Sequence, residues 1–177
     1  MKLLLLGLCL TFIATLTSAQ NSDDIWIAIE PCSDQSSTFE NRLAACNAAL
    51  LIDDPTELAL QERASLYMQM GRIDEALNDL NEAVVRTEQA KGGEFWMGTL
   101  SALLNRTVFY LETSQIELAL GDMERILTES SPPIIASIQK DLQHLGTLTG
   151  EADGTFDART MTAIEICFRD QMCYENW

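Results

Sequence analysis

The sequence predicts an all-α fold in which helical hairpins are followed by a smaller helical segment. Three observations lead to this fold class. Apolar residues recur at helical spacing between points marked by proline and glycine, and one motif returns at a constant offset. No stretch alternates between apolar and polar residues for long enough to indicate a sheet.

The N-terminal residues have the pattern of a secretory signal peptide. Lys2 precedes an apolar run, and the small residues Thr17 and Ala19 mark a cleavage point after Ala19. The run is shorter than the about 20 apolar residues that a membrane-spanning helix needs. We therefore expect residues 1–19 to be removed and the mature chain to be periplasmic or secreted, without a membrane anchor.

Four cysteines remain once Cys9 has left with the signal peptide. An even number of cysteines in an oxidising compartment indicates two disulfide bridges, and four cysteines allow three pairings. Sequence separation favours Cys32 with Cys46 and Cys167 with Cys173. A zinc site is the competing interpretation, but the chain has one histidine and no C-x-x-C spacing. We expect no metal.

Helical spacing accounts for most of the chain after the first cysteine. Apolar residues from Phe39 to Leu50 fall on one helical face. Pro55 ends this helix and opens the next, because proline suits a first turn and disfavours α geometry in the residue before it. Gly71 and the glycine pair at 92–93 separate the later helices. The predicted helices cover residues 38–52, 58–70, 73–90, 94–112 and 116–128.

A motif repeats within the predicted helices. Arg63-Ala64-x-x-Tyr67 returns as Arg106-Thr107-x-x-Tyr110, at an offset of 43 residues. The same offset aligns Gly71 with Ser114, Ala76 with Ala119, Leu80 with Met123 and Ala83 with Ile126. Small side chains at these positions let two antiparallel helices approach closely. The repeat therefore predicts two similar hairpins.

The pattern Leu60-x-x-Arg63-Ala64-x-x-Tyr67-x-x-x-Gly71-x-x-x-x-Ala76-x-x-x-Leu80-x-x-Ala83 resembles the tetratricopeptide repeat, or TPR. The second copy departs from the family at Thr107, Ser114 and Ile126, and its offset is about nine residues longer than the usual repeat. Residues 39–54 resemble the second helix of a degenerate first repeat. The resemblance assigns residues 20–131 to a TPR-like domain.

A different pattern begins after the pair Pro132-Pro133. The run Ile135-x-x-Ile138-Gln139-x-x-Leu142-x-x-Leu145-Gly146, followed by Gly150-x-x-Asp153-Gly154-x-Phe156, resembles the peptidoglycan-binding-like domain of cell-wall hydrolases. It departs from that family at Cys167, where an aromatic residue is usual. The resemblance assigns residues 132–177 to a small helical domain, in which Asp157 is expected to cap a helix. The candidate glycan-facing residues are Phe168, Tyr174 and Trp177.

Composition and motifs argue against several classes of function. A net charge of −16 repels nucleic acid and anionic membranes and favours cationic or apolar partners, although it also serves solubility alone. No phosphate-binding loop, nucleophile elbow or carboxylate pair is found in the sequence. The single histidine, His144, has no sequence partner for catalysis and is expected to face solvent. We predict a non-catalytic protein with no cofactor.

The TPR resemblance implies a concave binding face formed by the first helix of each hairpin. On that face it places Gln61, Ser65, Met68, Gln69, Leu104, Val108, Leu111 and Glu112. These side chains are apolar with amide edges, which suits a protein or peptide segment with apolar anchors. The alternative is that Leu104, Val108 and Leu111 pack against the C-terminal segment and leave no groove.

The predicted function is an exported adaptor that holds a protein partner. Two other functions stay open at the level of sequence. One is a peptidoglycan-binding protein that acts through its C-terminal segment, and the other is an accessory subunit or inhibitor of an envelope enzyme.

Overall fold

The computed structural model describes residues 29–51, 57–90, 95–170, 173 and 176. Within these residues the chain forms helices and connecting loops and no strand. The predicted all-α fold is therefore confirmed. The predicted signal peptide, residues 1–19, lies outside the described residues.

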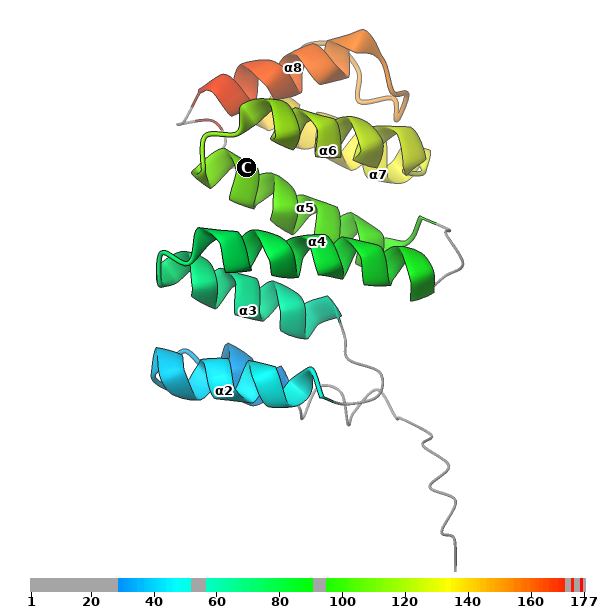
Figure 1. The fold of residues 1–177 in the computed structure, drawn as a ribbon. Coiled ribbons are helices and arrows are strands. Elements are labelled where there is room, and N and C mark those ends of the chain that lie inside the picture. Colours follow the sequence, from blue (N-terminus) through cyan, green and yellow to red (C-terminus); the bar gives the residue numbers. More distant parts are fainter. Residues whose placement is uncertain (1–28, 52–56, 91–94, 171–172, 174–175, 177) are drawn as a thin grey trace, which may run out of the picture.

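The helices α2 to α6 stack in chain order, as Figure 1 shows, and α8 packs against both α6 and α7. A short helical stretch at residues 29–33 precedes them. The helices are α2 (Phe39–Ala49), α3 (Glu57–Gln69), α4 (Ile73–Ala90), α5 (Met97–Glu112), α6 (Ile116–Glu129), α7 (Pro132–His144) and α8 (Ala158–Arg169). The predicted helices match α2 to α6 to within three residues at each end.

Two helix boundaries differ from the prediction by three residues: α2 ends at Ala49 and not at residue 52, and α5 begins at Met97 and not at residue 94. Trp96 occupies the N-cap position in an extended conformation, with φ −140° and ψ 177°. Its indole N–H donates a 2.8 Å hydrogen bond to the carbonyl oxygen of Thr87 in α4. This bond holds the chain extended against α4, so the helix starts only after the tryptophan.

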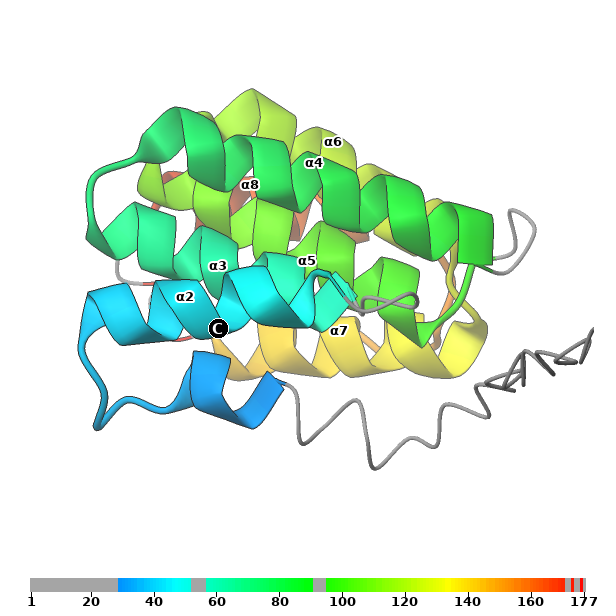
Figure 2. The same ribbon diagram turned by 60° about the horizontal axis from the view of Figure 1, so that its bottom comes forward.

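The helices pack in two layers around a continuous apolar core. Figure 2 shows α4 and α6 on one side of the stack and α3 and α5 on the other. The close contacts are between α3 and α4, α5 and α6, α4 and α5, and α2 and α3. One core cluster runs from Leu60 in α3 to Cys173 beyond α8, so it crosses the boundary predicted at residue 132. The C-terminal helices share the core of the hairpins through α6 and α8.

A partly buried arginine clamp joins the two helices of the first hairpin to α2. The guanidinium of Arg63 in α3 donates two hydrogen bonds of 2.7 Å to the carboxylate of Asp79 in α4. Its third bond, also 2.7 Å, goes to the side-chain oxygen of Asn47 in α2. Hydrogen bonding to Asp79 raises the pKa of Arg63. A bidentate pair of this kind fixes the relative position of the helices that it joins.

The clamp recurs 43 residues later, at the offset that the sequence motif predicts. Arg106 in α5 donates to Asp122 in α6 at 2.9 and 2.7 Å and to Asn81 in α4 at 2.9 Å. Hydrogen bonding to Asp122 raises the pKa of Arg106. The two hairpins are therefore equivalent in their contacts as well as in their sequence.

The turns inside the two hairpins also correspond. Gly71 has φ +71°, and Ser114, which the motif aligns with it, has φ +60°. The amide that follows each turn residue donates to the carbonyl of Tyr67 at 2.8 Å in the first hairpin and of Tyr110 at 2.7 Å in the second. Because the left-handed conformation favours glycine, Ser114 adopts it at some cost in free energy.

Both predicted disulfide pairings are confirmed. Cys32 is bonded to Cys46, with their Cα atoms 4.8 Å apart, and Cys167 to Cys173, with Cα atoms 5.1 Å apart. The first bridge ties residues 29–33 to α2, and the second ties the chain after α8 back to that helix. All four cysteines are buried.

The loop between α7 and α8 is organised by Gln139, which is fully buried. Its side-chain oxygen accepts from the amide of Gly154 at 2.8 Å, and its nitrogen donates to the carbonyl of Thr155 at 3.0 Å. Gly154 has φ +73°, and a side chain there would meet the carbonyl oxygen of Pro132 at the start of α7. Asp157 caps α8 as predicted, since it accepts from the amide of Thr160 at 3.0 Å.

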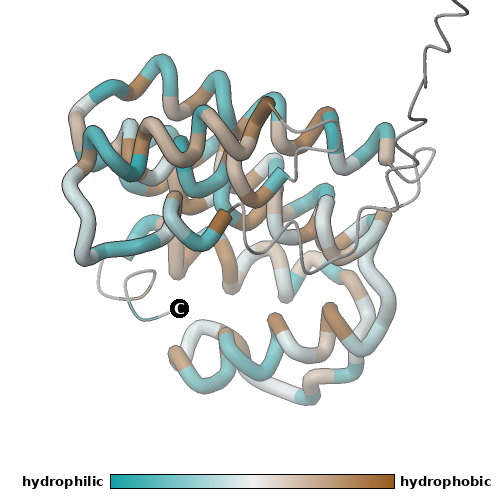
Figure 3. The backbone as a smooth tube through the Cα atoms, turned by 90° about the horizontal axis from the view of Figure 1, so that it is seen from below, coloured by the Kyte–Doolittle hydropathy of each residue, from teal (hydrophilic) through white to brown (hydrophobic). Residues whose placement is uncertain are grey.

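Polar and apolar residues are interleaved along every helix, as the hydropathy colours of Figure 3 show. Among the described residues, no helix combines the length and the apolarity that crossing a membrane requires.

Candidate functional site

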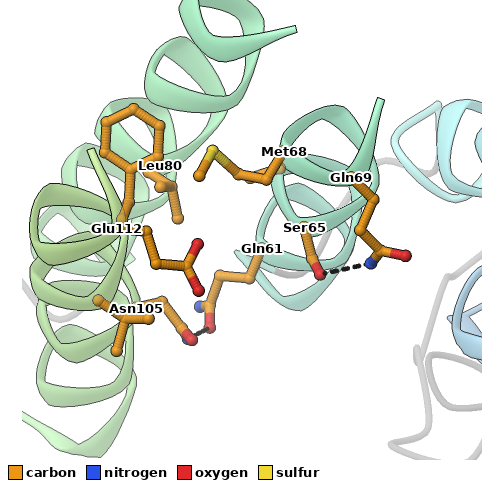
Figure 4. Close-up of a pocket in the computed structure, with 10 residues that line it drawn as sticks. Gln61, Ser65, Met68, Gln69, Leu80, Asn105 and Glu112 are labelled. Atoms are coloured by element: carbon orange, nitrogen blue, oxygen red, sulfur yellow. Dashed lines mark hydrogen bonds between the residues drawn. The ribbon is translucent and has the colours of Figure 1, made fainter. Parts of the chain in front are cut away.

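A groove with a volume of about 260 Å³ lies between α3 and α5 on the predicted concave face (Figure 4). Side chains of both helices point across it, and one residue of α4 joins them. The groove is lined by Gln61, Ala64, Ser65, Met68, Gln69, Leu80, Asn105, Val108, Phe109 and Glu112.

The middle of the groove is apolar. Leu80 and Phe109 form its floor and are buried, with 4% and 2% of their surfaces exposed. Met68 of α3 is partly buried above them, and Val108 of α5 is 52% exposed. A valine with half of its surface in water, beside a methionine, leaves apolar area that a bound side chain could cover.

Amide groups edge the groove on the side of α5. The side-chain oxygen of Gln61 accepts hydrogen bonds from the amide nitrogen of Asn105 and, at 3.2 Å, from the hydroxyl of Ser101. These bonds fix the orientation of the Gln61 amide. Its nitrogen is left buried and without a hydrogen-bond partner. Figure 4 shows Gln61, Asn105 and Glu112 gathered on this side of the groove.

Six of the eight residues predicted for the concave face line this groove. Leu104 is exposed at 38% but does not line it. Leu111 is 8% exposed and belongs to the core cluster, so its place on the predicted face is corrected. Leu111 is two residues from Phe109, or about 200° around α5, so its side chain faces away from the groove floor that Phe109 forms.

The alternative prediction was that Leu104, Val108 and Leu111 pack against the C-terminal segment and leave no groove. Of the three, only Leu111 is buried. Leu104 and Val108 stay exposed, and the groove is open.

Sequence reasoning assigned Ala64 of α3 to helix packing only, and on α5 it missed Asn105 and Phe109 as lining residues. Asn105 lies four residues before Phe109 and three before Val108, so helical spacing alone places all three on neighbouring parts of one face. Extending the predicted face by these steps would have found both residues. Leu80 of α4 was predicted to fill the space between the two helices of its hairpin. It also forms part of the groove floor.

The candidate glycan-facing residues do not form a surface in the described chain. Phe168 is 2% exposed and lies in the core cluster, which corrects its predicted role. Tyr174 and Trp177 lie outside the described residues.

Candidate catalytic or metal-binding groups are sparse in the part of the chain that the structure describes. His144 is exposed at the end of α7, as the sequence predicts. Among the described residues, no group of three histidine, cysteine, aspartate or glutamate side chains is arranged to hold a metal ion.

No family model, curated protein or solved structure matches this chain. The function proposed below therefore depends on the geometry of the groove between α3 and α5.

Proposed function

We propose that this protein is an exported, non-catalytic adaptor that binds a segment of a partner protein in the groove between α3 and α5. The observation that supports it is the pair Met68 and Val108, which leave apolar surface open above a buried floor, next to amide groups of fixed orientation. Apolar anchors from a bound segment would cover this surface, and amides beside it can bond its backbone.

The TPR resemblance supports the same proposal. In that family a ligand segment lies along the first helices of successive hairpins, which here are α3 and α5. Asn47 and Asn81, the third partners of the two clamps, are 34 residues apart, which is the length of a TPR unit. We therefore propose that α2 ends a degenerate first repeat and that α3 to α6 form the next two repeats.

The lining of the groove suits binding better than catalysis. Glu112 is the one acidic side chain among the described lining residues, and no histidine or cysteine lines the groove. General acid–base or nucleophilic chemistry needs a second group held against the first. A lone carboxylate in an apolar groove recognises a ligand more readily than it transforms one.

We propose that the protein and its partner meet outside the cytoplasm. The two disulfides are typical of a protein that folds outside the reducing cytoplasm. N-terminal sequencing of the protein purified from a periplasmic or culture fraction should give a chain that starts at Gln20. A chain that retains residues 1–19, or one recovered with free thiols from the cytoplasm, would contradict export.

Panning of a displayed random-peptide library against the exported protein tests binding directly. We expect enriched peptides with apolar anchors, and we expect Val108→Glu to abolish their capture by placing a carboxylate against those anchors. Val85→Glu on α4 is the matched control, because Val85 is also exposed, at 42%, and lies outside the groove.

Both variants should keep the circular dichroism spectrum and melting temperature of the parent protein. A library that yields no enriched peptide, or peptides that bind Val108→Glu and Val85→Glu equally, would refute binding in the groove.

A further inference from the structure

We infer that the segment bound in the groove is basic and carries two apolar anchors, because it also occupies a second hollow beside the groove. This inference rests on the proposed function. The second hollow has a volume of about 450 Å³ and lies at the start of α2. Its lining residues are Gln35, Ser37, Thr38, Phe39, Glu40, Arg42 and Gln69.

Gln69, near the end of α3, lines both the groove and the second hollow. The two depressions therefore meet at its side chain. A segment that leaves the groove over the end of α3 at Gln69 is therefore next to the second hollow. The combined surface runs over residues of α2, α3 and α5 and is longer than one anchor can cover.

Each depression combines an exposed apolar side chain with a carboxylate. In the groove these are Val108 and Glu112, which lie one helical turn apart on α5. In the second hollow they are Phe39, which is 42% exposed, and Glu40. This repeated combination fits a segment in which each apolar anchor is accompanied by a positively charged side chain.

The carboxylates of Glu40 and Glu112 are free to pair with a positively charged partner. Every described arginine lies within 4.0 Å of a carboxylate oxygen, whereas neither Glu40 nor Glu112 forms an ion pair with a described residue. Arg42 lines the second hollow, but it is 7% exposed and donates to the carbonyl of Cys32 at 3.0 Å. With a net charge of −16, the chain repels an acidic segment.

The peptides enriched by panning provide the first test. We expect lysine or arginine next to the apolar anchors, and we expect a synthetic copy of the best peptide to bind more weakly when those residues are replaced by glutamine. Peptides that depend on Val108 but are neutral or acidic would overturn the inference and leave the proposed function standing. Peptides that do not depend on Val108 would refute the proposed function itself.

The carboxylates are tested with the same synthetic peptide and fluorescence anisotropy. The double variant Glu40→Gln with Glu112→Gln should raise its Kd by about tenfold, since two exposed ion pairs are lost. Glu124→Gln is the control, because Glu124 is exposed on α6 and lines neither depression. An equal Kd for the double variant and for Glu124→Gln would overturn the role of charge.

The second anchor is tested by Phe39→Ala against Leu118→Ala. Both side chains are about half exposed, at 42% and 50%, and Leu118 lies on α6 away from both depressions. We expect the Kd of the peptide to rise about tenfold for Phe39→Ala only, from the apolar area that is no longer covered. No change for Phe39→Ala would overturn the extension of the site into the second hollow.

Discussion

Replacing Asp79 by alanine is expected to destabilise the protein through the charge that it leaves behind. The Asp79 side chain is 2% exposed, and its partner Arg63 is 21% exposed. Removing one member of a buried pair costs about 3 to 5 kcal/mol of unfolding free energy, because the other charge stays desolvated. Since Arg63 keeps some contact with water and its bond to Asn47, we expect the lower end, about 3 kcal/mol.

The assay is urea unfolding followed by circular dichroism. With a slope of about 2 kcal/mol per molar urea, a loss of about 3 kcal/mol lowers the midpoint by about 1.5 M. The clamp in the second hairpin provides an internal replicate. Asp122→Ala should lower the midpoint by a similar or slightly smaller amount, because Asp122 is 9% exposed.

Glu75→Ala is the control, since Glu75 is on the same helix as Asp79 and forms an exposed pair with Arg72, which precedes that helix. Exposed pairs contribute little, so its midpoint should stay close to that of the parent protein. The double variant Arg63→Met with Asp79→Leu should recover part of the loss, because no unpaired charge remains buried. If Asp79→Ala and Glu75→Ala shift the midpoint equally, the clamp does not stabilise the hairpin and the reasoning is wrong.

Three further outcomes follow from the fold. Ser114→Gly should raise the unfolding free energy by about 1 kcal/mol, because glycine adopts φ +60° without strain; a lower urea midpoint would contradict this. Ala76→Trp should lower it by about 3 kcal/mol, because Ala76 is fully buried, whereas Val85→Trp on the same helix should not; equal midpoints would contradict close packing. Replacing both Cys32 and Cys46 by alanine should cost about 3 kcal/mol, and a melting temperature unchanged in calorimetry would show that this bridge constrains little.

The sequence predicted the helices and their order because helix formation depends mostly on neighbours in the chain. The spacing of apolar residues, together with Gly71 and the prolines, located α3, α4 and α6 to within a residue. The 43-residue offset predicted two equivalent hairpins, and the paired clamps at Arg63 and Arg106 have the same geometry. The disulfide pairings were predictable because each cysteine has a partner close to it in sequence.

The tertiary structure alone decided which side chains remain open to a partner. Helical spacing locates a residue around the helix axis, but exposure depends on where the neighbouring helices lie, which is fixed by contacts distant in sequence. Leu111 and Val108 are three residues apart and equally apolar, yet one is 8% exposed and the other 52%. Phe168 is aromatic, as glycan-binding residues often are, but its position on α8 places its side chain in the core. Gln69 joins two depressions only because α2 packs beside α3, a contact that no pattern within either helix records.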